Sequence, residues 1–476
     1  MIFKDIFPFF ENEFSNTEIK GLTSDSRQVE SGYVFVCING PLSDGHNYAA
    51  SALEKGAVII VAERDLGFFN QIIVDNTREV FAKMCAAWFG NPADSLKIIG
   101  VTGTNGKTSV TYMLKSILEQ TGAKVGLIGT IQNMIGERVI EAKNTTPGVY
   151  ELNALFAEML KEGCTYAIME VSSHALDQDR VYGINFESAI FTNITQDHLD
   201  YHLNMENYLA AKKKLFYMCK TAIINIDDPY SKQLISGLNC EIITYSTGND
   251  STYSAKGIQY KPASVEYELL GKDSLNHIKV NTGGRFTVYN SMCAIIAAVN
   301  LGVSIADAAS ALLGLSGVKG RAEVVPTGRD FTVIIDYAHT PDGLKNILST
   351  FRECQKNRLI VLFGCGGDRD KTKRPIMGSV AVYNADYVIV TSDNPRSEEP
   401  AAIIADILEG TTGTNKPVKV IENRIEAINY AISIAAPDDI IVLAGKGHET
   451  YQILKDRTIH LDEREVVTDA LSRLSN

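Results

Sequence analysis

The sequence predicts an α/β fold in three domains: a small N-terminal α/β domain, a central domain with a mostly parallel sheet, and a doubly wound C-terminal domain. Short apolar runs alternate with amphipathic helical stretches, which is the pattern of strand–helix–strand units. Many of these runs end in polar loops, where parallel sheets bind their ligands. The 476 residues are enough for about three domains of ~150 residues. We place them at 1–92, 93–325 and 326–476.

Composition and charge exclude several classes of protein. Hydrophobic residues make up 45% of the chain and charged residues 21%, which predicts a sizeable core and no wholesale disorder. The net charge of −12 argues against a broad nucleic-acid surface. The eight cysteines form no C-x-x-C pair, as expected of reduced thiols in the cytoplasm. The N-terminal stretch lacks a basic segment followed by a long apolar run, and Glu11 and Glu13 interrupt it early, so we expect no signal peptide. Because no apolar stretch reaches about 18 residues, we expect no insertion into a membrane.

The N-terminal domain begins with a polar cluster and continues as an α/β unit. Apolar runs at 33–38 and 57–61 predict strands, and the stretch between them predicts a helix that ends at Gly56. The cluster Ser24-Asp25-Ser26-Arg27 precedes them. These residue types are common in turns, so an ordinary turn and a ligand site both remain open.

The central domain contains a candidate phosphate-binding loop, Gly103-Thr104-Asn105-Gly106-Lys107-Thr108. An apolar strand precedes it and an amphipathic helix follows. Glycine allows the backbone to approach a phosphate closely, and the helix N-terminus presents N–H groups to the anion. Lys107 is expected to reach the outer phosphates and the Thr108 hydroxyl to bind Mg²⁺. Only two residues separate the glycines, fewer than in the strict P-loop pattern, and an ordinary turn with a helix cap is the alternative.

Three further residues of this domain are candidates for metal or catalytic roles. Glu170 lies in the stretch 166–174, which reads as a buried strand ending in polar residues, and is a candidate Mg²⁺ ligand, with a salt-bridged glutamate as the alternative. His198 lies in a loop with two Asp and another His, which suits either a metal site or a structural loop with Asx turns. Lys212 follows two alanines in a run of three lysines. Such runs are usually solvated, but a desolvated lysine has a depressed pKa and a reactive amine. Residues 240–285 predict an antiparallel excursion, followed by an Ala-rich helix from Asn290 to Asn300.

The C-terminal domain has the strand-then-loop rhythm of a Rossmann-like doubly wound sheet. Apolar runs at 332–336, 359–363, 387–391 and 439–444 each lead into a polar loop. Arg369, Arg396 and Glu449 lie in these loops. Arginine suits carboxylates and glutamate suits an ammonium group, so together they predict a zwitterionic ligand, although each alone reads as a surface charge. Just before this domain, Arg321 lies in a glycine-bracketed basic turn suited to a phosphate.

Eleven short stretches, taken in order, resemble the Mur ligase family: TSDSRQV, GTNGKT, NTTPG, MEVSSHALDQDRV, FTNITQDHLDYH, YLAAKKKLF, GRA, IDYAHTPDGL, FGCGGDRDKTKRP, TSDNPRSEEP and GKGHETYQ. The resemblance covers nearly the whole chain. It implies a cytoplasmic three-domain ligase of peptidoglycan synthesis, of the branch that adds the third amino acid to UDP-MurNAc-L-Ala-D-Glu using ATP and two Mg²⁺ ions. We expect a monomer whose C-terminal domain closes on the central domain.

The resemblance also implies roles for individual residues. Those expected at the uridine part are Ser24, Asp25, Ser26 and Arg27, and those expected at the sugar-dipeptide are Thr145, Thr146, Ser172, Gln178 and Arg180. Those expected at ATP are Gly103, Thr104, Asn105, Gly106, Lys107, Thr108, Asn290, Arg321, Asp336 and His339. Those expected at Mg²⁺ are Thr108, Glu170, His198 and Lys212, the last as a carbamate; catalytic roles fall on Lys107, Glu170, His198 and Lys212. The DNPR stretch resembles the signature for meso-diaminopimelate, and the expected amino-acid pocket is Arg369, Asp393, Asn394, Arg396, Gly445 and Glu449.

The implied chemistry is formation of an acyl phosphate on the D-Glu γ-carboxylate, followed by attack of the diaminopimelate amine. A lysine-adding ligase of the same family, a folate-polyglutamate ligase and a P-loop switch protein are the alternatives. Arg396 argues against the first, the joint presence of DSR and DNPR against the second, and the four ligand-type loops of the C-terminal domain against the third. The chain departs from the family pattern at Thr287, often Asn there, and at Leu203, often Gly after the Tyr-His pair.

Overall fold

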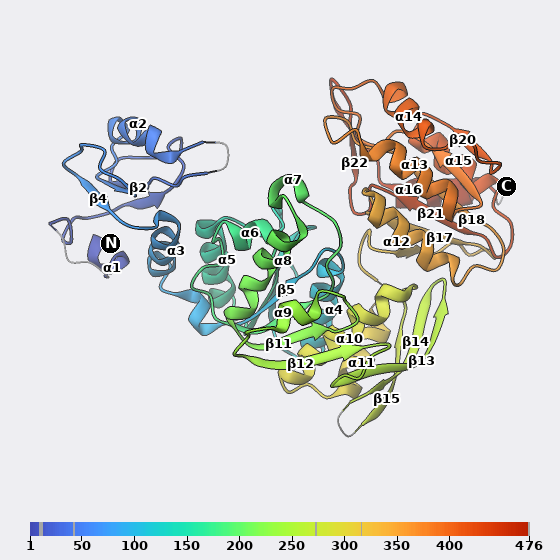
Figure 1. Cartoon of the computed structure of the whole chain (residues 1–476), viewed down its shortest axis with the longest axis horizontal. Helices are drawn as coiled ribbons and strands as arrows, with labels where there is room; N and C mark the ends of the chain where they lie inside the picture. The colour runs from blue at the N-terminus through green and yellow to red at the C-terminus, as the bar shows by residue number, and fades with distance from the viewer. Residues whose placement is uncertain (9–12, 41–42, 272–273, 316, 475–476) are drawn as a thin grey trace. The chain divides into compact units, whose positions relative to one another are not determined.

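The computed structural model describes residues 1–8, 13–40, 43–271, 274–315 and 317–474. The chain forms two compact units. The first consists of Met1–Gly103, Leu118–Ile224 and Asp228–Ile243, and the second of Thr104–Ile117, Asn225–Asp227 and Thr244–Asn476. This division differs from the domain boundaries at 92 and 325 that the sequence suggests, and those boundaries stay predictions. Each part of the chain is described by itself below (Figure 1).

The N-terminal part is a small parallel sheet with helices on both faces. Its strands, in the spatial order β1-β2-β3-β4, are Gly21–Thr23, Tyr33–Val36, Ile59–Ala62 and Gln71–Ile73, and its helices are α1 (Phe3–Ile6), η1 (Gly45–Tyr48), α2 (Ala49–Glu54) and α3 (Thr77–Trp88). Val34 and Val36 pack in one core with α1 and α3, whereas Phe35 packs with α2, because alternate side chains of a strand face opposite sides. The two predicted strands and the helix between them are present. The three-residue strands β1 and β4 were not predicted.

The central sheet has eleven strands within the described residues, in the order β15-β14-β13-β12-β11-β10-β5-β9-β6-β7-β8. Their bounds are β5 Lys97–Thr102, β6 Val125–Ile128, β7 Asn133–Ile135, β8 Arg138–Ile140, β9 Tyr166–Glu170, β10 Phe186–Phe191, β11 Cys219–Asn225, β12 Glu241–Ser246, β13 Tyr253–Lys261, β14 Ser264–Leu270 and β15 Leu275–Val280. Strands β6, β9, β5, β10 and β11 are parallel, and β13, β14 and β15 form the predicted antiparallel excursion. The candidate phosphate loop therefore leaves a central strand, β5, which lies between β9 and β10.

The helices of the central part include the two that the sequence indicated most clearly. They are η2 Pro92–Ser95, α4 Lys107–Gln120, α5 Val149–Lys161, α6 Ser173–Asp177, α7 Leu199–His202, α8 Met205–Lys213, η3 Lys214–Tyr217, α9 Ser231–Ile235, α10 Arg285–Asn300 and α11 Ile305–Gly314. Helix α4 begins at Lys107, directly after the glycine loop, as predicted. The Ala-rich helix α10 is almost wholly buried, but it begins at Arg285 rather than Asn290. Gly284, with φ of +100°, makes the turn into it.

The connection between α7 and α8 contains a strained turn at Leu203. Its φ is 71° and its ψ is −40°, and the Asn204 N–H donates to the His202 carbonyl at 2.9 Å. This three-residue turn with positive φ at its centre is rare and unfavourable for a side chain as large as leucine. The position is where the family pattern often has glycine. The turn connects α7, whose N-cap is His198, to α8, which contains Lys212.

We predict that Leu203→Gly stabilises the protein by about 1 kcal/mol, because glycine relieves the positive-φ strain. Little burial is lost, since Leu203 is 77% exposed. Urea denaturation of both proteins measures the difference. Leu313→Gly is the matched control, because Leu313 is also exposed but lies within α11, where glycine should destabilise by a similar amount. A loss of stability in both variants would contradict the strained turn.

The C-terminal part is a doubly wound sheet, as predicted. Within the described residues its strands follow the order β16-β17-β21-β18-β19-β20 (Glu323–Val325, Thr332–Asp336, Ile440–Ala444, Leu359–Phe363, Tyr387–Val390, Val418–Val420), with a separate hairpin of β22 Tyr451–Ile453 and β23 Thr458–His460. Its helices are α12 Pro341–Arg352, α13 Lys373–Asn384, α14 Pro400–Glu409, α15 Arg424–Ser433 and α16 Glu463–Arg473. Among the described residues of the six-stranded sheet, neighbouring strands are parallel except for β16 and β17.

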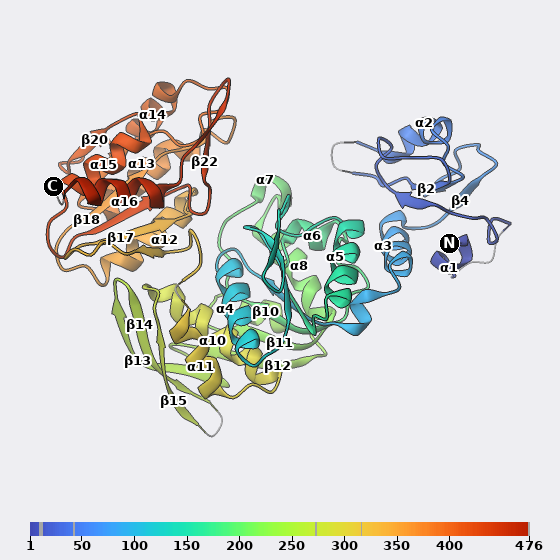
Figure 2. The same cartoon turned by 180° about the vertical axis from the view of Figure 1, so that it is seen from behind.

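Alternation along the buried strands explains the two helical layers of this sheet. Leu359, Val361 and Phe363 of β18 pack against α12, α13 and α14. Ile360 and Leu362 of the same strand pack against α15 and α16; α16 crosses the front of this part in Figure 2. A strand that is buried on both faces appears in the sequence as a continuous apolar run. For this reason β18 could be predicted from the run LIVLF. Among the described residues, no helix combines the length and the apolar character that crossing a membrane requires.

Candidate active site

The loop after β5 can only be built with glycine at its two ends. Gly103 has a φ of 149°, and a β-carbon there would overlap the Thr192 hydroxyl. Gly106 has a φ of 90°, and a β-carbon there would lie 2.5 Å from Asn290 Oδ1. Asn290, expected at the nucleotide, is thus next to the loop. The Lys107 ammonium donates to the Thr104 carbonyl at 2.9 Å, and Thr108 is buried at the start of α4.

Glu170 lies buried at the carboxyl end of β9. Its Oε1 accepts from the Thr130 N–H and its Oε2 from the Thr130 hydroxyl, both at 2.9 Å. Among the described residues no cation forms an ion pair with it, so the salt-bridged alternative is wrong. Thr130 follows Gly129 after β6 and was not predicted as a site residue; its hydroxyl also lies 3.0 Å from that of Thr145.

The residues expected at the sugar-dipeptide lie together in the first unit. The Thr146 hydroxyl donates to the Glu170 carbonyl at 2.9 Å and accepts from the Ser172 N–H at 3.0 Å. Arg180 donates from Nη1 to the Thr146 carbonyl at 2.9 Å and from Nη2 to Gln178 Oε1 at 2.7 Å. These bonds hold Arg180 at the edge of the group. The structure therefore brings Thr146, Ser172, Gln178 and Arg180 together beside the backbone of Glu170 at the end of β9.

Lys212 is desolvated, as the sequence suggested. It is 1% exposed, its Nζ donates to the Gly103 carbonyl at 2.9 Å, and that Nζ lies 4.4 Å from the centre of the Tyr208 ring. Lys214 of the same run is exposed. The amine of Lys212 therefore lies against the first residue of the glycine loop.

His198 belongs to a group of aromatic rings that the sequence did not indicate. Its φ is 54°, and its ring lies 4.9 Å from that of His174, which also contacts Tyr201 and His202. Burial lowers the pKa of His174 to about 4, and the charges of His198 and His202 lower it further. His202 donates or accepts at Ser173 Oγ, 2.9 Å away. His174 ends the MEVSSH stretch. Its position directly after a buried strand is the feature of the sequence that could have identified it as a site residue.

The donor chemistry of these residues suits Mg²⁺. Mg²⁺ in nucleotide sites is commonly held by one or two carboxylates, with water and substrate phosphates completing the shell. Glu170 supplies a buried carboxylate whose oxygens each accept a single hydrogen bond, and Thr108 supplies a hydroxyl at the phosphate loop. Within the described residues no cluster of three His, Cys, Asp or Glu side chains is arranged to hold a metal unaided.

The cluster expected at uridine forms a turn directly after β1. Asp25 Oδ1 accepts from the Arg27 N–H at 2.9 Å, and the Arg27 guanidinium, 86% exposed, lies 2.7 Å from Asp25 Oδ2. The hydrogen bond from Arg27 lowers the pKa of Asp25. The turn alternative is thus correct as local structure, and the ligand role of Ser24–Arg27 stays a prediction.

The basic turn at Arg321 and the loop after β17 meet in the second unit. The Arg321 guanidinium lies over the Tyr337 ring at 4.8 Å. Asp336 accepts from the Ala322 N–H at 2.7 Å and the Ala338 N–H at 2.8 Å, and burial raises its pKa. His339 Nδ1 lies 2.9 Å from the Tyr337 carbonyl. Arg321, Asp336 and His339, expected at the nucleotide, are therefore close together.

His448 lies beside this group and gives a pH prediction. Its ring centre is 5.0 Å from that of Tyr337, and its Nδ1 has no hydrogen-bond partner within the described residues. Burial lowers the pKa of His448 to about 4, and the charge of Arg321 lowers it further. The folded pKa is thus below the unfolded value of about 6.5. The stability that neutral His448 contributes is present above pH 6.5 and is lost as the pH falls toward 4.

We expect the free energy of unfolding of the wild type to fall relative to that of His448→Gln between pH 6.5 and 4. The difference should be constant above pH 7. Urea denaturation across this range measures it. A difference that stays flat down to pH 4 would mean that His448 accepts a proton as readily in the folded as in the unfolded chain.

The loops after β18, β19 and β21 bring the expected amino-acid residues together. Asn394 Nδ2 donates to Glu449 Oε2 at 2.9 Å. Arg396 donates to the Gly367 carbonyl at 2.8 Å, and its guanidinium lies against Gly366, as does the Arg369 side chain. Gly445 has a φ of 115°, and a β-carbon there would lie 2.7 Å from Asp393 Oδ2. Lys446, which was not predicted, is buried at the centre of this group.

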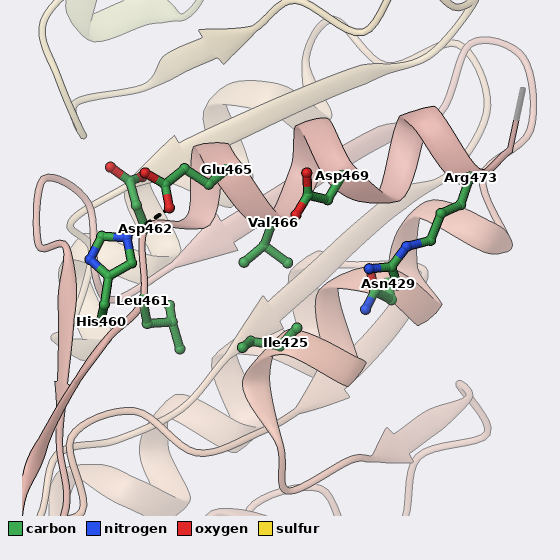
Figure 3. Close-up of a pocket in the computed structure, with 9 residues that line it drawn as sticks. All are labelled: Ile425, Asn429, His460, Leu461, Asp462, Glu465, Val466, Asp469 and Arg473. Carbon is green, nitrogen blue, oxygen red and sulfur yellow. Dashed lines mark hydrogen bonds and ion pairs between the residues drawn. The ribbon is translucent and has the colours of Figure 1, made fainter.

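A separate hollow of about 170 Å³ lies between α15 and α16 (Figure 3). Ile425 and Val466 line it, with Asp469, Asn429 and Arg473 at one end. At the other end His460 Nε2 lies 2.7 Å from Glu465 Oε2. None of the predicted site residues lines this hollow.

Comparison with known proteins identifies the family. Residues 18–87 match the model described as "Mur ligase family, catalytic domain", residues 101–298 the Mur ligase middle domain and residues 320–447 the Mur ligase glutamate ligase domain. Two relatives carry the name UDP-N-acetylmuramoyl-L-alanyl-D-glutamate–2,6-diaminopimelate ligase. The chain is 49% identical to that of Caldanaerobacter subterraneus subsp. tengcongensis, over 96% of this chain and 95% of the relative, and 48% identical to ligase 1 of Clostridium acetobutylicum, over 96% of each.

Solved structures agree. A structure with the same enzyme name has a TM-score of 0.76 and 31% identity, and covers 100% of this chain and 99% of its own. Mycobacterium tuberculosis folylpolyglutamate synthase, at 18% identity and a TM-score of 0.63 over 83% of this chain and 95% of its own, shares the fold. The chain belongs to the Mur ligase family.

Proposed function

We propose that this chain is the ATP-dependent ligase that joins meso-diaminopimelate to UDP-N-acetylmuramoyl-L-alanyl-D-glutamate in peptidoglycan precursor synthesis. Full-length relatives at 45–49% identity are named for this addition of 2,6-diaminopimelate. The observation in the structure that supports it best is the convergence of Asn394, Arg396 and Glu449. An amide, a guanidinium and a carboxylate match a ligand with both a carboxylate and an ammonium group. We also infer a cytoplasmic location, where ATP is available.

The reaction proceeds in two steps. The D-Glu γ-carboxylate attacks the γ-phosphorus of ATP, which forms an acyl phosphate and releases ADP. The diaminopimelate amine then attacks the acyl carbon, the tetrahedral intermediate collapses, and phosphate leaves with the carboxylate oxygen that was phosphorylated. Phosphorylation by ATP thus replaces a poor leaving group, the oxide of the carboxylate, with a good leaving group, phosphate. No Ser or Cys nucleophile is required.

The chain's own residues have distinct tasks in these steps. The glycine loop and the N-terminus of α4 bind the phosphates, and Lys107 stabilises the charge that develops on the transferred phosphoryl group. Thr146, Ser172 and Arg180 orient the sugar-dipeptide beside Glu170. Thr108, Glu170, His198 and Lys212 as a carbamate are the residues that would hold two Mg²⁺ ions. Bound Mg²⁺ supplies charge neutralisation at the phosphates.

An isotope experiment tests this route. UDP-MurNAc-L-Ala-D-Glu with ¹⁸O in the γ-carboxylate should transfer one ¹⁸O atom to the released phosphate, as ³¹P NMR or mass spectrometry detects. Phosphate release should require all three substrates. Release of phosphate from ATP alone, with no dependence on the other substrates, would favour a nucleotide switch. Turnover with a reduced folate and glutamate would favour the folate-polyglutamate alternative.

A further inference from the structure

The most deeply buried cation of the amino-acid group is Lys446. Its side chain has 0% exposure, although lysine is almost never fully buried without partners. It lies in the loop after β21, two residues past the end of the strand. The Glu449 N–H donates to the Lys446 carbonyl at 3.0 Å, which closes the loop into a turn. Both side chains of this turn therefore point to the same group of residues.

The Lys446 ammonium has two close acceptors. It donates to Asn394 Oδ1 at 3.0 Å and to Glu449 Oε2 at 2.9 Å, and Asp393 Oδ1 lies 3.9 Å away. Asn394 Nδ2 in turn donates to Glu449 Oε2 at 2.9 Å. Lysine, amide and carboxylate thus form a closed triangle of hydrogen bonds. Charge-assisted bonds of this kind are about twice as strong as neutral ones.

The triangle sets the orientation of the Asn394 amide. Its Oδ1 accepts from Lys446 and also from the Ile453 N–H at 2.9 Å, so the amide oxygen faces these two donors. The NH₂ group must then face Glu449. One N–H of Nδ2 is used there, which leaves the other to donate to a ligand. Rotating the amide by 180° would place its NH₂ against two donors.

The same triangle gives the two carboxylate oxygens of Glu449 different roles. Oε2 accepts from both Lys446 and Asn394, so Oε1 is the oxygen that serves a ligand. Asn394 then offers a donor and Glu449 an acceptor side by side. A donor suits the carboxylate of an amino acid, and a carboxylate acceptor suits its ammonium group. Because its ammonium is enclosed by these acceptors, Lys446 acts through them.

We propose that Lys446 is a positioning residue that holds Asn394 and Glu449 in the orientation that binds the amino-acid substrate, an inference that rests on the proposed function. Without Lys446, Glu449 and Asp393 lose the cation buried beside them, and the amide of Asn394 loses the donor that sets its direction. Binding of the amino acid should weaken. Phosphoryl transfer to the sugar-dipeptide does not involve these residues and should persist.

Steady-state kinetics of Lys446→Met tests this inference. We expect the KM for diaminopimelate to rise about 30-fold or more, as for loss of one partner of a buried charge pair. The KM values for ATP and UDP-MurNAc-L-Ala-D-Glu should stay within twofold of the wild type, and kcat at saturating diaminopimelate within threefold. Lys446→Gln keeps a donor near the same place without the charge, so its KM should lie between the two. Circular dichroism shows whether Lys446→Met folds. If it does not fold, Lys446→Gln replaces it as the test variant.

Lys455→Met is the matched control, because Lys455 is exposed and pairs with Glu399 at the surface. Its kinetics should equal those of the wild type. An unchanged KM for diaminopimelate in a folded Lys446 variant would overturn the inference, and so would a fall in kcat with all three KM values unchanged, which is the mark of general damage. If the wild type shows no turnover that depends on diaminopimelate, the proposed function fails, and this inference with it.

Discussion

Lys212→Ala should lose at least about 100-fold in turnover, the scale seen when one preorganised electrostatic group is removed from an active site. Lys212 is 1% exposed, and its amine bonds to the carbonyl of Gly103 at the entrance of the phosphate loop. The substitution removes that bond and deletes the amine proposed to become a carbamate. Phosphate release with all three substrates measures the loss.

Bicarbonate and a neighbouring lysine provide the controls for Lys212. High bicarbonate should not restore Lys212→Ala, because alanine has no amine to modify. Lys213→Ala should turn over at nearly the wild-type rate, since Lys213 bonds to the Gln233 carbonyl, away from the glycine loop. Near-normal turnover of Lys212→Ala would refute the catalytic role of Lys212. Restoration of the activity of Lys212→Ala by a short carboxylic acid such as propionate would support a need for a carboxylate at this place.

Arg396→Ala should remove discrimination between diaminopimelate and L-lysine. The two substrates differ by one carboxylate, and a guanidinium is the group best suited to bind it. Arg396 is held by its donation to the Gly367 carbonyl and by the Asn394 loop. We expect a loss of about 2–4 kcal/mol in kcat/KM for diaminopimelate, as for truncating one partner of a buried ion pair. The value for lysine should change little, because lysine has no carboxylate to lose a partner.

Two other arginine variants sharpen this result. Arg396→Lys keeps the charge but not the two-pronged geometry, so it should recover only part of the preference. Arg457→Ala changes an exposed arginine in the β22–β23 turn and should have no effect on either substrate. A preference that is the same in Arg396→Ala as in the wild type would show that another group binds the second carboxylate.

The sheets could be predicted from the sequence where their strands are buried on both faces. LIVLF of β18 and YVIV of β19 are continuous apolar runs, and each was placed correctly. Strands β1, β4, β7 and β8 have only three residues each, too few for periodicity to show. Strand β13 lies in the predicted antiparallel excursion, but its own bounds could not be predicted, because exposed and half-buried residues occupy much of its length. The start of α10 was missed because Arg285-Phe286-Thr287 has no helical signature of its own.

The site residues could be predicted from the sequence where the residue type itself indicates the role. They could not be predicted where the role depends on burial in the fold. The glycine loop could be found because Gly103 and Gly106 adopt conformations that other residues avoid. Lys446 could not be found, because a lysine between two glycines reads as a surface charge and only the fold buries it. Thr130 and Tyr208 contact Glu170 and Lys212, yet nothing in their own sequence neighbourhoods distinguishes them from core or turn residues.

The proposed function is tested most directly by competition in one reaction. The chain is incubated with ATP, Mg²⁺, UDP-MurNAc-L-Ala-D-Glu and equal amounts of meso-diaminopimelate and L-lysine, and the UDP-linked products are separated and weighed by mass spectrometry. We predict that the tripeptide ending in diaminopimelate is by far the main product and that ADP forms in equal amount. A predominant lysine product, or consumption of ATP without any tripeptide, would contradict the account.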